Sequence, residues 1–202
     1  MDEAPYRLGF VTGGLFAHQA RIAAELYLDT DNWETVKDRV REDNLFQTRT
    51  PSTGTRYLLE VVRRLKALNQ KQLQVVAKDN HKDRCQVMWV AACRHYQLLG
   101  DFAHDVVRDR YLHGDSRLAP KDFTRFVHQQ SLWHPELEEK TERTISNLRH
   151  NAFLMLRQAS MLEPDGLVVG AFFSAPVLDC LQPNDFLFFP TDDSAWKGHH
   201  DN

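Results

Sequence analysis

RTPSTGTRYLLEVVRRLKAL, residues 49–68, is the stretch from which the predicted fold of this chain follows. It opens with a polar turn punctuated by Pro51 and Gly54, so a helix is expected from about Thr55. Three hydroxyl side chains in the turn can accept hydrogen bonds from the first free amides of that helix: Thr50, Ser52 and Thr53. Apolar residues then follow one face of a 3.6-residue period: Tyr57, Leu58, Val61, Val62, Leu65 and Leu68.

The outer side of this helix is basic. At about 100° per residue, Arg56, Glu60 and Arg63 are expected opposite the apolar face, with Arg64 and Lys66 on its flanks. Between residues 49 and 71 six basic residues minus one acid give a charge of +5, in a chain whose net charge is −3. The basic residues are Arg49, Arg56, Arg63, Arg64, Lys66 and Lys71. A capped helix with such a face is suited to phosphates, although the same pattern also fits an ordinary solvated face.

Length and composition indicate an ordinary soluble protein. The chain has 202 residues, of which 42% are hydrophobic and 26% charged, and its acidic balance argues against a wholly basic nucleic-acid coat protein. Its three cysteines, an odd number without zinc-knuckle spacing, favour a reduced cytoplasmic protein. The longest apolar run, 167–178, is interrupted by Gly170 and Pro176 and falls short of the ~20 residues of a membrane helix. We therefore expect no membrane association.

The elements around the basic helix also read as helical. A helix at 17–28 precedes a second one, introduced by a capping-box spacing at Asp31 and Glu34 and ending near 44–46. Helix, polar connection and basic helix follow in the order of a helix-turn-helix, although the connection is longer than usual. A long apolar helix at 84–112, bent at Gly100, is expected to be the central element. The other helices are expected at 70–78, 120–127 and 141–161.

The C-terminal part suggests a winged helix. Strands are expected at 167–173 and 186–189, separated by a short helix through Leu181. The predicted fold is therefore mainly α: an N-terminal helical bundle with a helix-turn-helix-like element, a central long helix, and a winged-helix-like part with two short strands. The predicted domains are 1–79 and 80–192, followed by a flexible tail at 193–202.

No motif in the chain carries a recognisable catalytic signature. A phosphate loop, a nucleophile elbow and a His-Glu-x-x-His pair are all missing from the sequence. His104 with Asp101, or with Asp105 and Asp109, could imitate a metal or acid–base cluster, but no third ligand has a convincing spacing. We therefore expect a protein without catalytic residues, cofactor or metal.

Several segments of the chain form a recognisable set. They are Gly-Gly-Leu (13–15) before RIAAELYL (21–28), EDNLFQTRTPST (42–53), RHYQLLGDF (94–102), and MLEPDGL (161–167) followed by Ser-Ala-Pro-Val-Leu (174–178). Together these segments resemble the BrxA family, accessory proteins of the bacterial BREX phage-defence systems. The resemblance implies a mostly helical protein that binds double-stranded DNA without known catalysis. It also implies a small helical domain like that of a transcription antitermination factor, and partners among the other components of the defence complex.

The leading hypothesis is a DNA-binding accessory protein that contacts phosphates with little sequence preference. The residues expected at the first DNA surface are Arg49, Thr50, Ser52, Thr53, Arg56, Arg63, Arg64 and Lys66. Those expected at a second surface are Lys121, Arg125, Arg143, Asn147 and Arg149. Two alternatives stay open: a scaffold that docks an acidic protein partner, and an RNA-binding helical module.

Overall fold

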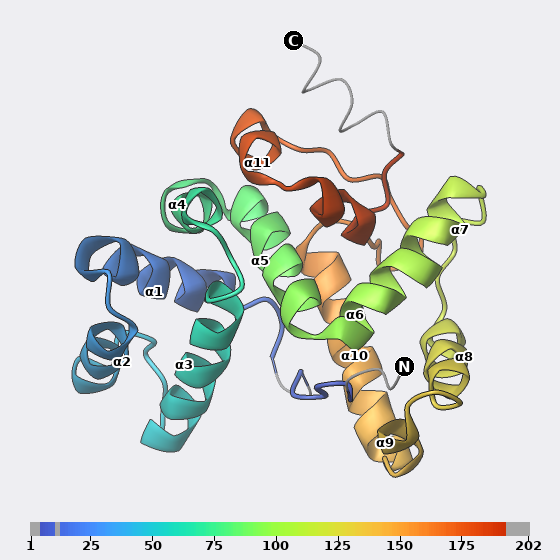
Figure 1. Ribbon diagram of the computed structural model, residues 1–202, viewed down its shortest axis with the longest axis horizontal. Helices are drawn as coiled ribbons and strands as arrows, with labels where there is room; N and C mark the ends of the chain where they lie inside the picture. Colours follow the sequence, from blue (N-terminus) through green and yellow to red (C-terminus); the bar gives the residue numbers. More distant parts are fainter. Residues whose placement is uncertain (1–4, 11–12, 193–202) are drawn as a thin grey trace. The chain divides into compact units, whose positions relative to one another are not determined.

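Helices make up most of the chain (Figure 1). The structure is a computed structural model that describes residues 5–10 and 13–192, so the predicted flexible tail lies outside the described residues. The mainly helical class is confirmed. Within the described part of the chain, β pairing consists of two isolated bridges, Arg117 with Leu167 and Leu162 with Val168. None of the helices in this part is both long and apolar enough to cross a membrane.

The chain divides into two compact units, and each is assembled from stretches distant in sequence. The first contains 15–91 and 173–181, and we call it the α3 unit after its basic helix. The second contains the described residues up to Gly14 together with 92–172 and 182–192, and we call it the α10 unit. The chain passes from one unit to the other after Ala91, inside helix α5 (His81–His95). The predicted domain limits, 1–79 and 80–192, remain a prediction.

The α3 unit is a helical bundle in which α1 packs against α2, α3 and α4, and α11 packs against α4. The helices are α1 (Ala17–Thr30), α2 (Trp33–Glu42), α3 (Pro51–Leu65), α4 (Gln70–Lys78), the first part of α5, and α11 (Ala175–Cys180). Four buried alanines on α1 let neighbouring helices approach closely: Ala17, Ala20, Ala23 and Ala24.

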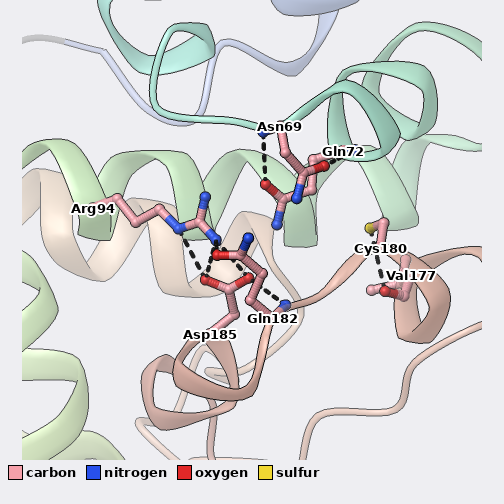
Figure 2. Close-up of polar contacts among 7 residues, drawn as sticks. All are labelled: Asn69, Gln72, Arg94, Val177, Cys180, Gln182 and Asp185. Atoms are coloured by element: carbon pink, nitrogen blue, oxygen red, sulfur yellow. Dashed lines mark hydrogen bonds and ion pairs between the residues drawn. The ribbon is translucent and has the colours of Figure 1, made fainter.

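Side-chain caps fix where two of these helices begin. The cap of α2 is Asn32, whose Oδ1 accepts hydrogen bonds from the amides of Glu34 and Thr35 at 2.8 and 3.3 Å. It replaces the capping box expected from Asp31. Asn69 and Gln72 form a reciprocal capping box at α4, and each side chain accepts the other's backbone amide (Figure 2).

The α10 unit contains the remaining helices. They are α6 (Gln97–Phe102), the π-helix η1 (Ala103–Arg108), α7 (Asp109–Leu112), α8 (Pro120–Gln130), α9 (Pro135–Glu138), α10 (Glu142–Gln158) and the 3-10 helix η2 (Pro183–Phe188). The predicted helices at 120–127 and 141–161 correspond to α8 and α10. Thr141 caps α10 by accepting the Thr144 amide at 3.2 Å.

The single long helix predicted at 84–112, with its bend at Gly100, is wrong. The chain leaves helical geometry at Tyr96 (φ −116°, ψ 91°), whose buried ring packs against Phe10 with centroids 5.2 Å apart. Gly100 lies inside α6, where an added Cβ would come within 3.1 Å of both the Cys93 carbonyl oxygen and the Phe188 ring. The glycine therefore serves close packing, and the aromatic residue marks the break.

The predicted two-stranded element is also wrong. Phe186 to Phe188 lie in η2, and the segment from Leu167 forms only the isolated bridges. The Asp185 carboxylate favours the 3-10 turn because it accepts the Gln182 amide at 2.8 Å and two bonds from Arg94 at 2.9 Å each (Figure 2). The winged-helix and helix-turn-helix assignments are not confirmed.

An N-terminal arm is clamped onto the α10 unit. The Tyr6 amide donates to Glu136 Oε1 at 2.7 Å, and the Tyr6 hydroxyl donates to Asp101 Oδ2 at 2.7 Å. The buried His134 ring lies 3.9 Å from the Tyr6 ring, between centroids, and its Nδ1 lies 3.2 Å from Glu136 Oε1. These contacts fasten the start of the chain to residues more than 90 positions away.

Candidate nucleic-acid interface

Helix α3 begins at Pro51, four residues earlier than the sequence indicated. Thr50 is its N-cap: the Thr50 Oγ1 accepts the Thr53 amide at 3.3 Å and donates to the Thr53 hydroxyl at 2.9 Å. Pro51 suits the first helical position, because an amide N–H at that position would have no hydrogen-bond partner within the helix and proline has no such N–H. Gly54, expected in the turn before the helix, lies inside it, and an added Cβ would come within 2.7 Å of the Thr48 hydroxyl. Thr50 therefore caps the helix, as the sequence also indicated, and the contact of Thr50, Ser52 and Thr53 with DNA stays a prediction.

Arg64 and Glu60 are buried, which corrects two positions of the predicted basic face. Arg64 is 0% exposed, its Nε donates to Glu60 Oε1 at 2.7 Å, and its Nη2 lies 2.7 Å from the same oxygen. The guanidinium also lies 5.3 Å from the centroid of the Phe16 ring. Their spacing of four residues places both side chains on one side of the helix. Arg64 is therefore unavailable to DNA, since its charge is paired inside the protein.

The burial of this pair makes the surface of residues 49–71 purely cationic. Glu60 is the only acid in the segment, and it is buried. Five basic side chains remain exposed: Arg49, Arg56, Arg63, Lys66 and Lys71. From Arg56 to Lys66 the exposed cations span about 15 Å of helix, at roughly 1.5 Å per residue.

The exposed cations of α3 differ in their surroundings. Among the described residues, Arg56 and Arg63 have no ion-pair partner, and the Arg56 guanidinium lies 5.8 Å from the Tyr57 ring centroid. The pKa of the Glu34 carboxyl on α2 lies below its usual value, mainly because Lys37 donates a hydrogen bond to it. The positive charge of Lys66 lowers this pKa further by a smaller amount. Arg56 and Arg63, like Arg49 and Lys71, can thus contact an external anion without giving up an internal ion pair.

The second predicted set of residues lies in the α10 unit. Lys121 and Arg125 are exposed on α8, and Arg143 and Asn147 are exposed on α10. Arg125 lies 4.0 Å from the carboxylate of Asp122, which Arg110 also contacts at 2.9 Å. The two predicted sets therefore belong to different units, and each forms a candidate surface of its own.

Arg149 differs from its neighbours because it is half-buried. Its Nη1 donates to the Thr124 hydroxyl at 3.1 Å and its Nη2 to the Ser146 hydroxyl at 3.2 Å. It lines a pocket of about 590 Å³ that the sequence did not indicate. Ser146 lies three residues before Arg149, but Thr124 comes from another helix, so no local pattern could have revealed the site.

The described residues contain no group of three or more His, Cys, Asp or Glu side chains that could hold a metal ion. His104 Nδ1 instead lies 2.6 Å from Asp105 Oδ1, and both side chains are exposed. The three cysteines, all within the described part of the chain, are buried and form no disulfide there.

Comparisons with known proteins agree with this fold and with the resemblance noted in the sequence. The family model named BrxA matches residues 4–185. The chain is 26% identical over 157 residues to the BREX protein BrxA of Escherichia coli O9:H4 (strain HS). The aligned region covers 77% of this chain and 74% of that protein. The chain is 30% identical over 111 residues to the BREX protein BrxA of Paramagnetospirillum magneticum (strain ATCC 700264 / AMB-1), covering 55% and 56%.

A solved structure shares the fold. The crystal structure of an uncharacterized protein from Magnetospirillum magneticum aligns with a TM-score of 0.78 at 21% identity, covering 92% of this chain and 96% of that one. Because the family model spans nearly the whole sequence, the chain belongs to the BrxA family.

Proposed function

We propose that this member of the BrxA family serves a BREX phage-defence system as a non-catalytic protein that binds double-stranded DNA. Binding would occur mainly through phosphates and with little sequence preference, in the cytoplasm and in association with other components of the system. Family membership and the relatives' names support the role in defence. The observation that carries the DNA-binding part is the exposed surface of residues 49–71, where five basic side chains, two of them on α3, stand without an exposed acid.

The chemistry of this face favours phosphate contact over base reading. Arginine donates several hydrogen bonds in a planar fork that matches phosphate oxygens, and such contacts carry no sequence information by themselves. Arg56 and Arg63 are exposed and unpaired among the described residues, so neither must give up an internal ion pair to reach DNA. The proposed first DNA surface accordingly consists of the exposed cations Arg49, Arg56, Arg63 and Lys66 and the hydroxyls of Thr50, Ser52 and Thr53, without the buried Arg64.

A salt series of duplex binding tests this proposal. Fluorescence anisotropy with two unrelated duplexes of equal length should give similar affinities, each falling with salt. The slope of log K against log salt should be about −0.9 per phosphate contacted. The double variant R56E/R63E should bind more weakly and with a slope shallower by about 2. The matched control is K78E/K82E, which makes the same charge change at exposed positions of the same unit and should retain the slope.

The outcomes separate DNA binding from its alternatives. Failure of the wild-type protein to bind duplex at low salt, or an affinity independent of salt, would refute the proposal. Preferential competition by structured RNA would favour an RNA-binding module. Unchanged duplex binding by R56E/R63E, together with loss of association with another BREX component, would favour the scaffold.

The second surface requires its own variant because it belongs to the other unit. K121E/R125E reverses two exposed cations of α8, and its effect on the slope reports whether this surface contacts phosphates. The non-catalytic part of the proposal is checked by incubating duplex with protein and Mg²⁺. DNA should stay intact, and cutting activity that persists through repurification would overturn this part.

A further inference from the structure

We propose that the pocket formed by α8, α9 and α10 binds a small organic phosphate monoester, whose phosphate group contacts Arg149 and Lys140. This site is separate from the DNA-binding face of α3, and its ligand would be a small molecule. It therefore goes beyond the proposed function.

The pocket has the dimensions of a small-molecule site. Its volume is about 590 Å³, within the range of ~300–1,000 Å³ typical of such sites. Residues on or next to helices α8, α9 and α10 line it, and the three helices belong to the same unit. The lining residues are Thr124, Val127, His128, Ser131, Leu137, Glu138, Lys140, Glu142, Ile145, Ser146 and Arg149.

Arg149 is a preorganised anion-binding group. Its guanidinium is held by one hydroxyl from α8, Thr124, and one from α10, Ser146. These two bonds fix its position but leave its charge without a counterion, since no carboxylate pairs with it in the described residues. A partly buried cation is costly without a partner, so an incoming anion would gain the full benefit of the pairing.

Lys140 supplies a second positive charge at the same pocket. It too is half-buried and has no ion-pair partner among the residues that the structure describes. Two unpaired cations match the double negative charge of a phosphate monoester better than the single charge of a carboxylate. The Ser146 hydroxyl can donate a further hydrogen bond to one of its oxygens, whereas the Thr124 and Ser131 hydroxyls already donate to the carbonyls of Pro120 and His128.

The rest of the lining limits what else could enter. Val127 and Leu137 are buried aliphatic side chains that offer an apolar surface to the organic part of the ligand. Glu138 and Glu142 also line the pocket and are exposed, so a long polyanion such as a nucleic-acid strand would meet two negative charges. A single phosphate on a compact organic body is repelled less than a polyanion, because the two exposed carboxylates are screened by solvent more strongly than the half-buried cations that would hold it.

Isothermal titration calorimetry with the full-length protein tests the site. Adenosine 5′-monophosphate is the probe, and adenosine is its matched neutral counterpart. We expect the monophosphate to bind, and adenosine to bind about ten- to hundredfold more weakly, since the phosphate contacts are charge-assisted. R149Q should weaken monophosphate binding by a similar factor. R157Q, the same change at an exposed position of α10 outside the pocket, should bind as the wild type does.

A second variant keeps the test decisive if R149Q fails to fold. K140Q removes a cation that holds no internal ion pair, so its folding should be unaffected and its monophosphate affinity should fall. Absence of monophosphate binding at millimolar concentration, equal affinity for adenosine, or wild-type affinity in folded R149Q and K140Q would each overturn the proposal. DNA binding is measured through residues of α3 in the other unit, so the two proposals can fail independently.

Discussion

Glu60 and Arg64 lie on α3, whose exposed charges are all basic, yet their own charges face inward and neutralise each other. The 3.6-residue period correctly predicts that Arg56 and Arg63 face solvent. The period, however, describes only how residues are arranged around their own helix. It could not indicate that Phe16 lies beside the Arg64 guanidinium, or that Glu60 would be buried with it. Which charged residues of a helix face solvent depends on its neighbours, and the local sequence does not contain that information.

The buried pair makes a testable contribution to stability. E60A would leave the Arg64 charge buried without its partner and should lower the free energy of unfolding by about 3–5 kcal/mol. E60M/R64M replaces both groups with apolar side chains and should lose less, because no buried charge remains. Urea unfolding of the three proteins measures the difference. Equal losses in E60A and in the double variant would show that the uncompensated charge is not the cause.

The Cys85 thiol provides a pH-dependent prediction. Burial raises the pKa of this thiol to about 11 from an ordinary value of 9.0, since the thiolate would be poorly solvated. A pKa that is higher in the folded than in the unfolded state means that stability is lost as pH rises from about 9 towards 11. C85A should show a smaller loss across this interval in thermal unfolding. A pH dependence identical to that of the wild-type protein would contradict the assignment.

At the scale of elements, the sequence identified helices better than strands. Helices α8 and α10 each combine a start signal, Pro120 and Thr141 respectively, with a long apolar period. The positions predicted for both helices are close to the observed ones. The short apolar runs 167–173 and 186–189 have no such length. Periodicity alone cannot decide whether a short run is a strand or a turn of helix. At η2 the decision comes from Arg94, about 90 residues earlier, which holds the Asp185 carboxylate.

The clamp on the N-terminal arm should depend on the charge of Glu136. Burial alone would raise the pKa of this carboxyl, but hydrogen bonds from its backbone partners and the nearby His134 outweigh that effect and leave the pKa below its usual value of 4.5. The stabilising contribution is therefore present above about pH 4.5 and is lost as pH falls through the lowered pKa.

E136Q tests this clamp. The melting temperature of E136Q should lie below that of the wild-type protein at pH 7, and the gap should narrow as pH falls below about 4.5. The control is E139Q, which makes the same change at an exposed neighbour and should follow the wild-type curve. A gap that stays constant down to pH 3 would show that charge on Glu136 does not hold the arm.

At the scale of the whole molecule, the α3 unit is completed by a short segment from near the other end of the chain. Helix α11 packs against α4, and the Ser174 hydroxyl donates to Asp83 Oδ2 at 2.8 Å. Val177 of α11 is 0% exposed. Composition and local patterns along the chain could not predict this return, because the segment has no feature that marks its partner.

A charge placed in α11 should therefore disturb helices that are about 100 residues away in sequence. V177D would bury an unpaired carboxylate and should destabilise the α3 unit by about 3 kcal/mol or more. Hydrogen exchange followed by mass spectrometry should show faster exchange of the α4 amides. A175D introduces the same charge at an exposed position of α11 and should leave exchange unchanged. Protected α4 amides in V177D would mean that α11 does not stabilise this unit.

The interleaving of the two units also constrains how the protein is made. A ribosome releases the chain from its N-terminus at ~5–20 residues per second, and domains usually fold as they emerge. Here residues 15–91 emerge early, but their unit is completed only by residues 173–181. The contact of the N-terminal arm with Glu136 likewise forms only after Glu136 has been synthesised. Both units contain residues from the last third of the described chain. A chain that ends before residue 173 would therefore lack 173–181 from the α3 unit and 182–192 from the α10 unit, and neither unit would be complete.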